Sequence, residues 1–298
     1  MGLVRRTLSI ARATALEILS EPLSLLVLLA ALVLAVLAPA FHYHQFGEAT
    51  RMARDAGFSA LFTCGSVVAV FGTIRAIRSE IESGTLEMAL AHPVSRVGFF
   101  LAKAIGAFAA YLVFAAIVFL TAMTIVDGAA IGGEIAEKTG ALARLYGPRL
   151  AMGVGVIVLP LVVAAALNRF AGCRFVISSV LISLLCAGVS AMTAIGRDAG
   201  LALRMLPAAV LLGVLAAVLL SAAAAFAVRF RAHAAAAACG LVLAAFLPAI
   251  GNYYLADALS NGGRVPWGYV GLATLAAVPA VLLFLLLGVH FINGRDIT

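Results

Sequence analysis

Few side chains in this 298-residue sequence have the type and spacing that chemistry requires. His42 and His44 could hold a metal ion, but they lack a third ligand, and a His-Tyr-His run is also typical of the membrane–water interface. The four cysteines show no C-x-x-C spacing and predict neither a zinc site nor a disulfide framework. We therefore expect no metal site and no directly bound cofactor. A membrane-embedded enzyme or redox subunit is a further alternative, and it would use His42, His44, His233 or His290.

Hydroxylated side chains form the second group of candidates, and they gather in one apolar segment. In lipid, such residues can line a polar path for a cargo, or they can allow two helices to approach closely. Both interpretations fit the sequence, and close packing is the common use of small residues in membrane spans. The residues are Ser178, Ser179, Ser183, Ser190 and Thr193.

The motifs of several catalytic classes are missing from the sequence. It contains no G-x-x-x-x-G-K-[ST] phosphate loop, so an ATP-driven role would need an ATPase on another polypeptide. It also lacks the H-E-x-x-H and G-x-S-x-G motifs of common hydrolases. No charged residue stands near the middle of an apolar run, which points away from ion-coupled transport. We expect no catalytic residues.

The elements that must position these residues are membrane helices. The sequence is 64% hydrophobic and 11% charged, with a mean hydropathy of +1.15, as in a polytopic membrane protein. Only helices satisfy all backbone amides within one segment of this kind. The net charge of +7 comes from basic residues at the ends of apolar runs, which indicates topology signals rather than nucleic-acid binding. The expected fold is an all-α bundle.

The apolar runs predict about eight transmembrane helices, with six as the alternative. A cytoplasmic amino terminus places 12 of the 20 basic residues on the cytoplasmic side, as the positive-inside rule requires, and makes both termini cytoplasmic. The predicted spans are residues 22–41, 58–76, 99–125, 149–167, 175–195, 205–228, 233–256 and 267–290.

The sequence predicts one domain, residues 1–298, in which the next two segments lie outside the spans. Residues 1–21 have the spacing of an amphipathic helix that lies in the membrane interface. A twin-arginine or cleaved signal is the competing interpretation, but Glu17 and Glu21 interrupt such a leader. Residues 126–148 carry mixed charges and form the longest predicted external loop.

The stretch from Arg75 to Lys103 is the longest run dense in charge, and it lies between two predicted spans. It must therefore sit in water. Gly84 interrupts one helical run, Thr85 can cap the next, and Pro93 stops that second helix after about two turns. An ordinary solvated turn is the simpler interpretation of these charges. The combination of break, short helix and stop favours a functional loop.

This stretch resembles the first cytoplasmic loop of the type-two class of ATP-binding-cassette (ABC) transporter permeases. The similarity lies in the order S-E-I-E-S-G-T-L-E, then A-H-P-V-S-R, then a lysine, with Ala102 where that family usually has glycine. It extends more weakly to A-R-A-T-A-L-E-I-L-S-E-P-L near the amino terminus and to G-R-D-I at the carboxyl end. The matching residues are Glu80, Glu82, Gly84, Thr85, Leu86, Glu87, Pro93, Val94, Ser95, Arg96 and Lys103.

The resemblance implies that a coupling helix in residues 75–98 docks on a separate ABC ATPase, which binds ATP and magnesium. Nine residues would carry this contact: Glu80, Glu82, Gly84, Thr85, Leu86, Glu87, Pro93, Ser95 and Arg96. It also implies a second permease copy or paralogue, a bacterial cytoplasmic (inner) membrane, and export of a cargo that the residues do not identify. A non-transporting membrane anchor or mechanotransmission subunit for the same ATPase is the alternative.

Overall fold

The computed structural model describes residues 2–37, 49–82, 95–139, 142–251 and 265–294, and all regular structure in these ranges is helical. This confirms the expected all-α membrane fold. The helices are α1 (Gly2–Leu19), α2 (Pro22–Leu37), α3 (Ala49–Val67), the π-helical turn η2 (Val68–Gly72), α4 (Thr73–Glu82), α6 (Arg96–Thr139), α7 (Leu142–Ala171), α8 (Phe175–Ile195), α9 (Ala199–Arg229), α10 (Ala232–Gly251) and α12 (Trp267–Asn293).

The number of spans lies close to the prediction. Six described helical stretches are long and apolar enough to cross a membrane, and the bent pair α1–α2 raises this number to seven. Residues 232–245 of α10 form a shorter apolar helix where a further span was expected. The six-span and eight-span alternatives therefore differ mainly in how α2 and α10 are counted.

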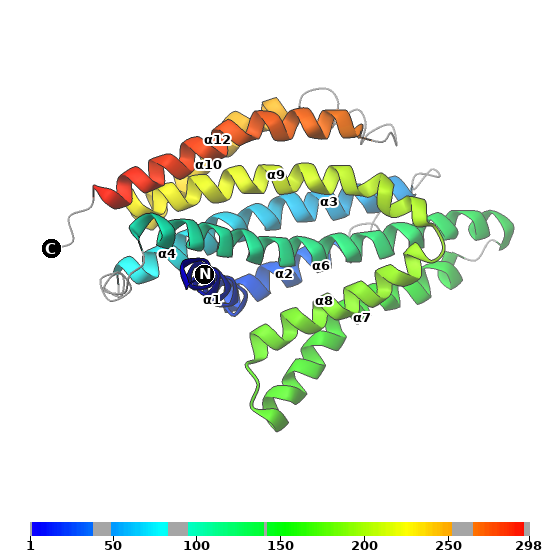
Figure 1. Cartoon of the computed structure of the whole chain (residues 1–298). Coiled ribbons are helices and arrows are strands. Elements are labelled where there is room, and N and C mark those ends of the chain that lie inside the picture. The colour runs from blue at the N-terminus through cyan, green and yellow to red at the C-terminus, as the bar shows by residue number, and fades with distance from the viewer. Residues whose placement is uncertain (1, 38–48, 83–94, 140–141, 252–264, 295–298) are drawn as a thin grey trace.

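The predicted external loop at residues 126–148 is largely continuous with its neighbouring helices. Helix α6 runs on to Thr139, and α7 begins at Leu142 (Figure 1). Good helix formers such as the Ala and Glu residues of this segment extend α6 beyond its apolar part. A fall in hydropathy predicts where a helix leaves the lipid, whereas the helix itself ends at helix-breaking residues.

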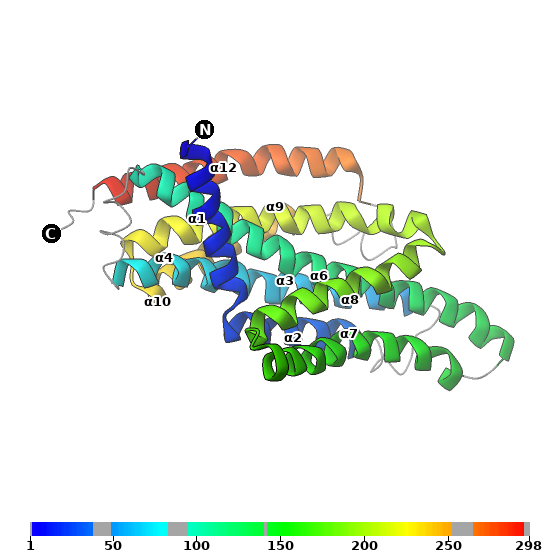
Figure 2. The same cartoon turned by 60° about the horizontal axis from the view of Figure 1, so that its bottom comes forward.

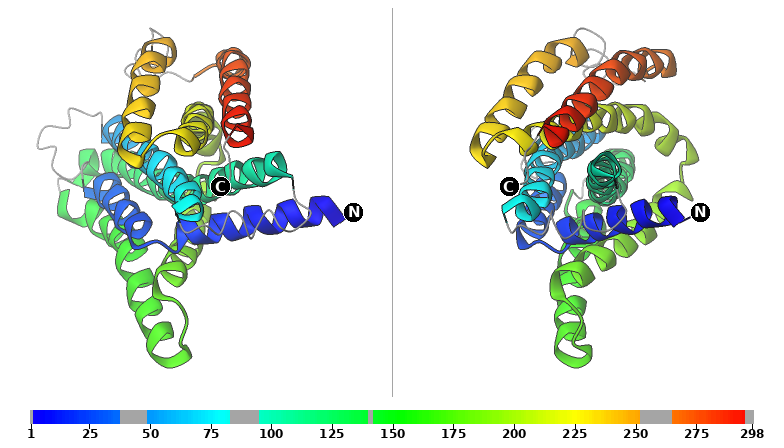
Figure 3. Two further views of the ribbon diagram at one scale, coloured as in Figure 1. Left: turned by 90° about the vertical axis from the view of Figure 1, so that its left-hand side faces the viewer. Right: turned by 60° about the vertical axis from the view of Figure 1, so that its left-hand side comes forward.

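Helix α6 is the centre of the bundle (Figure 3). It packs against α1, α3, α8, α7 and α9, while α10 and α12 pack on the outer side of α9. The α7–α8 hairpin diverges from the bundle toward its tip, where Gly172 takes a left-handed φ of 66° in a short turn (Figure 1). The core therefore lies where α3, α6 and α9 meet.

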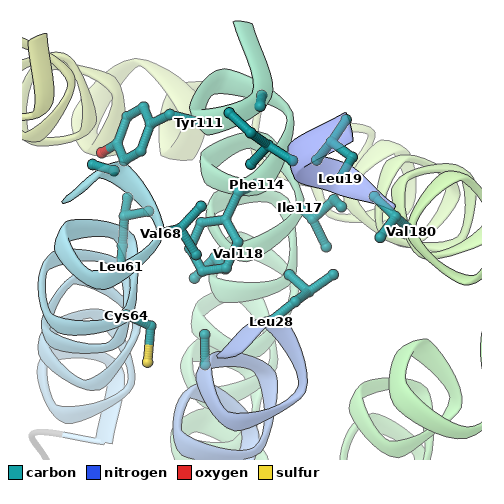
Figure 4. Close-up of a cluster of buried hydrophobic side chains, with 14 of the residues drawn as sticks. Leu19, Leu28, Leu61, Cys64, Val68, Tyr111, Phe114, Ile117, Val118 and Val180 are labelled. Atoms are coloured by element: carbon teal, nitrogen blue, oxygen red, sulfur yellow. The ribbon is translucent and has the colours of Figure 1, made fainter. Parts of the chain in front are cut away.

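Burial separates central from peripheral spans. In the most apolar window of α6, 61% of the residues are buried, against 11% in α12. The exposed side chains of α12 include Leu272, Leu275 and Leu286, which form an apolar surface suited to lipid. In the core, Phe114, Ile117 and other side chains of α6 meet residues of α2, α3 and α8 (Figure 4).

Helix α1 crosses over the bundle instead of running along the long helices, as Figure 2 shows. Its axis makes an angle of 64° with α2, which fits the predicted helix in the membrane interface. Its buried face includes Ala11, Thr14 and Ile18, whereas Leu8 is exposed. Thr14 is polar yet buried, and its hydroxyl donates a hydrogen bond to the Ile10 carbonyl at 3.0 Å.

The contact between α1 and α6 depends on Gly106. A Cβ at this position would lie 2.4 Å from the Ala11 carbonyl oxygen and 2.8 Å from Thr14 Cβ. Such distances force the backbone of α1 away from α6, because a carbonyl oxygen cannot rotate aside as a side chain can.

We predict that Gly106→Ala lowers the thermal stability of the purified protein, by about 1–3 kcal/mol of unfolding free energy, because overpacking outweighs the helix propensity of alanine. Thermal unfolding in detergent measures this change. Gly155→Ala is the matched control, since a Cβ there meets nothing within 4 Å. Equal unfolding temperatures for the two variants would contradict the close contact.

Candidate functional site

Charged residues around α4 form the most connected polar cluster in the described part of the chain. We call this group the α4 charge cluster; it comprises Glu17, Glu21, Arg75, Arg78, Ser79, Glu80, Glu82 and Lys103. Its members come from α1, the α1–α2 break, α4 and α6. The cluster lies directly before residues 83–94, the part of the predicted coupling loop outside the described residues.

Lys103 is the buried centre of this cluster, with a side chain only 3% exposed. Its Nζ lies 2.7 Å from Glu80 Oε1 and 3.4 Å from Glu17 Oε2, and it donates to the Ala76 carbonyl at 3.1 Å. The Phe99 ring lies on another side, with its centroid 6.0 Å from Nζ. A buried ammonium group is costly unless it is paired and hydrogen-bonded. The carboxylates of α1 and α4 fulfil this requirement together.

Two further contacts fix α4 from other directions. Arg75 Nε lies 2.5 Å from Glu21 Oε1 at the break between α1 and α2. Burial raises the pKa of Glu21, and the charge of Arg75 acts in the opposite direction. Arg78 donates to Glu82 Oε1 from Nε at 2.9 Å and also to the Phe230 carbonyl, at the end of α9. A cationic donor at the last carbonyls of a helix is a favourable arrangement.

The structure describes four of the nine predicted coupling residues. Glu80 faces Lys103 inside the chain, and Glu82 is largely exposed beside Arg78. The Ser95 hydroxyl accepts a hydrogen bond from the Gly98 amide at 3.1 Å and so caps α6, while Arg96 begins that helix. The predicted residues Gly84, Thr85, Leu86, Glu87 and Pro93 lie outside the described residues.

Sequence reasoning did not assign Glu17 and Glu21 to this site. Both interrupt a possible leader peptide and lie in the weaker amino-terminal resemblance, but neither was expected to contact the loop. A sharper signal was present: two acidic residues in an otherwise apolar and basic segment need cations nearby, and the charged stretch from Arg75 to Lys103 supplies them. Which cation meets which carboxylate depends on the crossing of α1 over α6, which the sequence does not specify.

A smaller pair lies at the opposite end of the bundle. Asp127 of α6 is 8% exposed in its side chain, and its Oδ2 lies 3.3 Å from Arg197 Nη1, in the turn after α8. Asp198 follows and caps α9 by accepting a hydrogen bond from the Gly200 amide at 2.8 Å. Arg204 Nη2 lies 3.2 Å from Asp198 Oδ2. The Asp127–Arg197 contact attaches the α8–α9 turn to α6, and the Asp198 contacts join the turn to α9.

The profile of the family described as ABC-2 family transporter protein matches residues 30–276. The chain belongs to this family. It is thus an integral membrane protein of the permease type, as the loop residues suggested. No curated protein and no solved structure matches the chain.

Other candidate residues of this ABC-2 chain have structural partners. The hydroxyls of Ser179 and Ser190 donate to carbonyls of their own helix, both at 2.9 Å, and Thr124 of α6 donates to Ser190 at 3.2 Å. This geometry fits close packing of α6 and α8. Among the described residues, no three His, Cys, Asp or Glu side chains gather as metal ligands, and His42 and His44 lie outside those residues.

We predict a strong energetic coupling between Lys103 and Glu80 in this ABC-2 chain. Lys103→Met should destabilise the protein, because it leaves two carboxylates near a buried site without their cation. The double variant Lys103→Met/Glu80→Gln should recover part of the loss, with a coupling energy of about 0.5–3 kcal/mol in a double-mutant cycle. Thermal or denaturant unfolding of all four proteins measures it.

Arg204 and Asp198 provide the control cycle. Their side chains are 49% and 46% exposed, so their coupling should not exceed about 1 kcal/mol. If both cycles give the same small coupling, the burial of Lys103 has no energetic importance.

Proposed function

We propose that this chain is the permease subunit that links ATP hydrolysis on a separate ABC ATPase to export of a cargo. The observation that carries the proposal is the bracing of α4 by four parts of the chain: α1, the α1–α2 break, α6 and the end of α9. Helix α4 enters the predicted coupling loop directly. A force applied to that loop would therefore reach the spans through α4.

A rigid connection is needed if a docking event is to move a span. Because α3, η2 and α4 follow one another without a break, residues 49–82 act as one long lever. The turn η2 lies in its middle, and π-helical turns within α-helices often occur at functional positions. Here Thr73 donates to the Ala69 carbonyl at 2.6 Å, and a Cβ on Gly72 would lie 3.0 Å from Ile18 of α1. We propose η2, which contacts α1, as the pivot about which this lever tilts.

The proposed cycle is mechanical. Closure of two ATPase subunits would push the loop and tilt the lever. The tilt would change the interface between two permease copies, and ATP would shift the population between the two conformations. The exposed carboxylate of Glu82, together with the charge expected at Glu87, would set the orientation of docking more than its affinity. ATP and magnesium would bind to the ATPase, and the α4 end of the bundle, with both chain termini, would face the cytoplasm of a bacterial inner membrane.

The test begins with affinity capture of the tagged full-length chain from its native membrane. We predict that an ABC ATPase co-purifies with the chain. Gly84→Leu and Pro93→Ala should each lower ATP turnover of this complex severalfold, because they alter the break and the stop of the coupling segment. The amount of chain inserted in the membrane should not change.

Gly155→Leu is the control, since its site in α7 is open and far from α4 in the chain. It should leave ATP turnover unchanged. Normal turnover in both loop variants would overturn the proposed coupling. If the complex hydrolyses ATP at a rate that no candidate cargo alters, and no cargo crosses the membrane in vesicles, the alternative of an anchor or mechanotransmission subunit replaces export.

A further inference from the structure

A groove of about 400 Å³ runs between α6 and α9, a volume in the range of small-molecule sites. We call it the α6–α9 groove. Its floor is formed by Leu61 and Tyr111, each only 2% exposed, and its walls include Leu112, Phe119, Val210 and Gly213. Figure 4 shows Tyr111 and Leu61 side by side, from α6 and α3.

The lining restricts the chemistry of an occupant. All lining side chains are apolar except Tyr111, whose hydroxyl donates to the Leu212 carbonyl at 3.4 Å. A polar ligand would therefore lose its bonds to water without gaining new ones. The occupant must be apolar, and it must be thin and flexible enough to reach the deeply buried Leu61.

The position of the groove within the spans indicates the source of the occupant. At about 1.5 Å per residue, Val210 lies about 9 Å along α9 from Arg204, whereas Ala217 lies about 18 Å from Arg229. Along α9 the groove is therefore closer to Arg204 than to Arg229.

Along α6 the groove lies between the two buried charges, with Phe108 about 8 Å from Lys103 and Phe119 about 12 Å from Asp127. Lys103 is buried and paired with carboxylates, so the accessible cations beside the groove are those of the Arg197 end, which also carries Arg204. Those two guanidinium groups are about half exposed. Each has five N–H donors and can bind a phosphate beside its aspartate partner.

We propose that the α6–α9 groove binds an acyl chain of a phospholipid from the leaflet at the Arg197 end, with the phosphate at Arg197 and Arg204. A second copy of this chain fits the groove less well, because a helix packs at about 8–10 Å from its neighbour and cannot enter between α6 and α9. An acyl chain reaches the floor and fills the space between them. This inference does not depend on the proposed transport function.

Photolabelling of the purified full-length chain in lipid vesicles tests the proposal. The probe is a phosphatidylglycerol with a diazirine in the outer half of one acyl chain, and mass spectrometry locates the labelled peptides. We expect labelling of residues 108–119 and 209–217. Gly213→Leu should reduce it by about tenfold, as expected when two or more methylene groups lose their burial.

Gly188→Leu is the matched control. Both glycines are open positions in transmembrane helices, where a Cβ meets nothing within 4 Å, but Gly188 lies on α8, outside the groove. It should leave labelling of the groove peptides unchanged. Ala217→Leu provides a second block of the groove, and size-exclusion chromatography selects the variants that remain monodisperse.

Two arginine variants and two lipid probes test the phosphate contact. Arg204→Gln should weaken labelling by the phosphatidylglycerol probe but not by a diacylglycerol probe with the same diazirine chain. Arg229→Gln, at the other end of α9, should affect neither. Equal labelling of the groove in Gly213→Leu and the unaltered chain would overturn the proposal. So would cross-links that join the groove peptides of one copy to a second copy.

Discussion

The buried ammonium group of Lys103 is the constraint on which one end of this bundle depends. A lysine that is 3% exposed is stable only with fixed partners, and here those partners belong to two other helices, α1 and α4. The crossing of α1 over α6 at Gly106 brings Glu17 within reach, and α4 brings Glu80. None of α1, α4 and α6 can move alone without separating charges.

Helix α6 carries a buried charge near each end of its apolar part. Lys103 and Asp127 are 24 residues apart, which corresponds to about 36 Å along a helix and exceeds the roughly 30 Å hydrocarbon thickness of a bilayer. Both charges can therefore lie just outside the hydrocarbon, each paired to a different part of the chain. The central helix thus holds the α1–α4 assembly at one end and the α8–α9 turn at the other, with the apolar groove between them.

The sequence predicts the elements of this structure better than their mutual contacts. The span at 175–195 agrees with α8 residue for residue, because a basic turn and a glycine limit the apolar run. In contrast, α3 begins at Ala49, nine residues before its predicted span, since a polar helix has no hydropathy signal. The motif directed attention to Glu80, but its buried contact with Lys103 depends on helix crossing and becomes visible only in three dimensions.

The crossing of α1 also has a consequence for how the chain is made. Glu17 emerges from the ribosome 86 residues before Lys103, and the surface around Gly106 follows later still. During synthesis, α1 therefore lies at the lipid surface with the Glu17 carboxylate hydrated until α6 has been inserted. The amphipathic pattern of α1 therefore suits the membrane surface before assembly as well as the folded protein. The ion pairs with Lys103 can form only after α6 has been inserted.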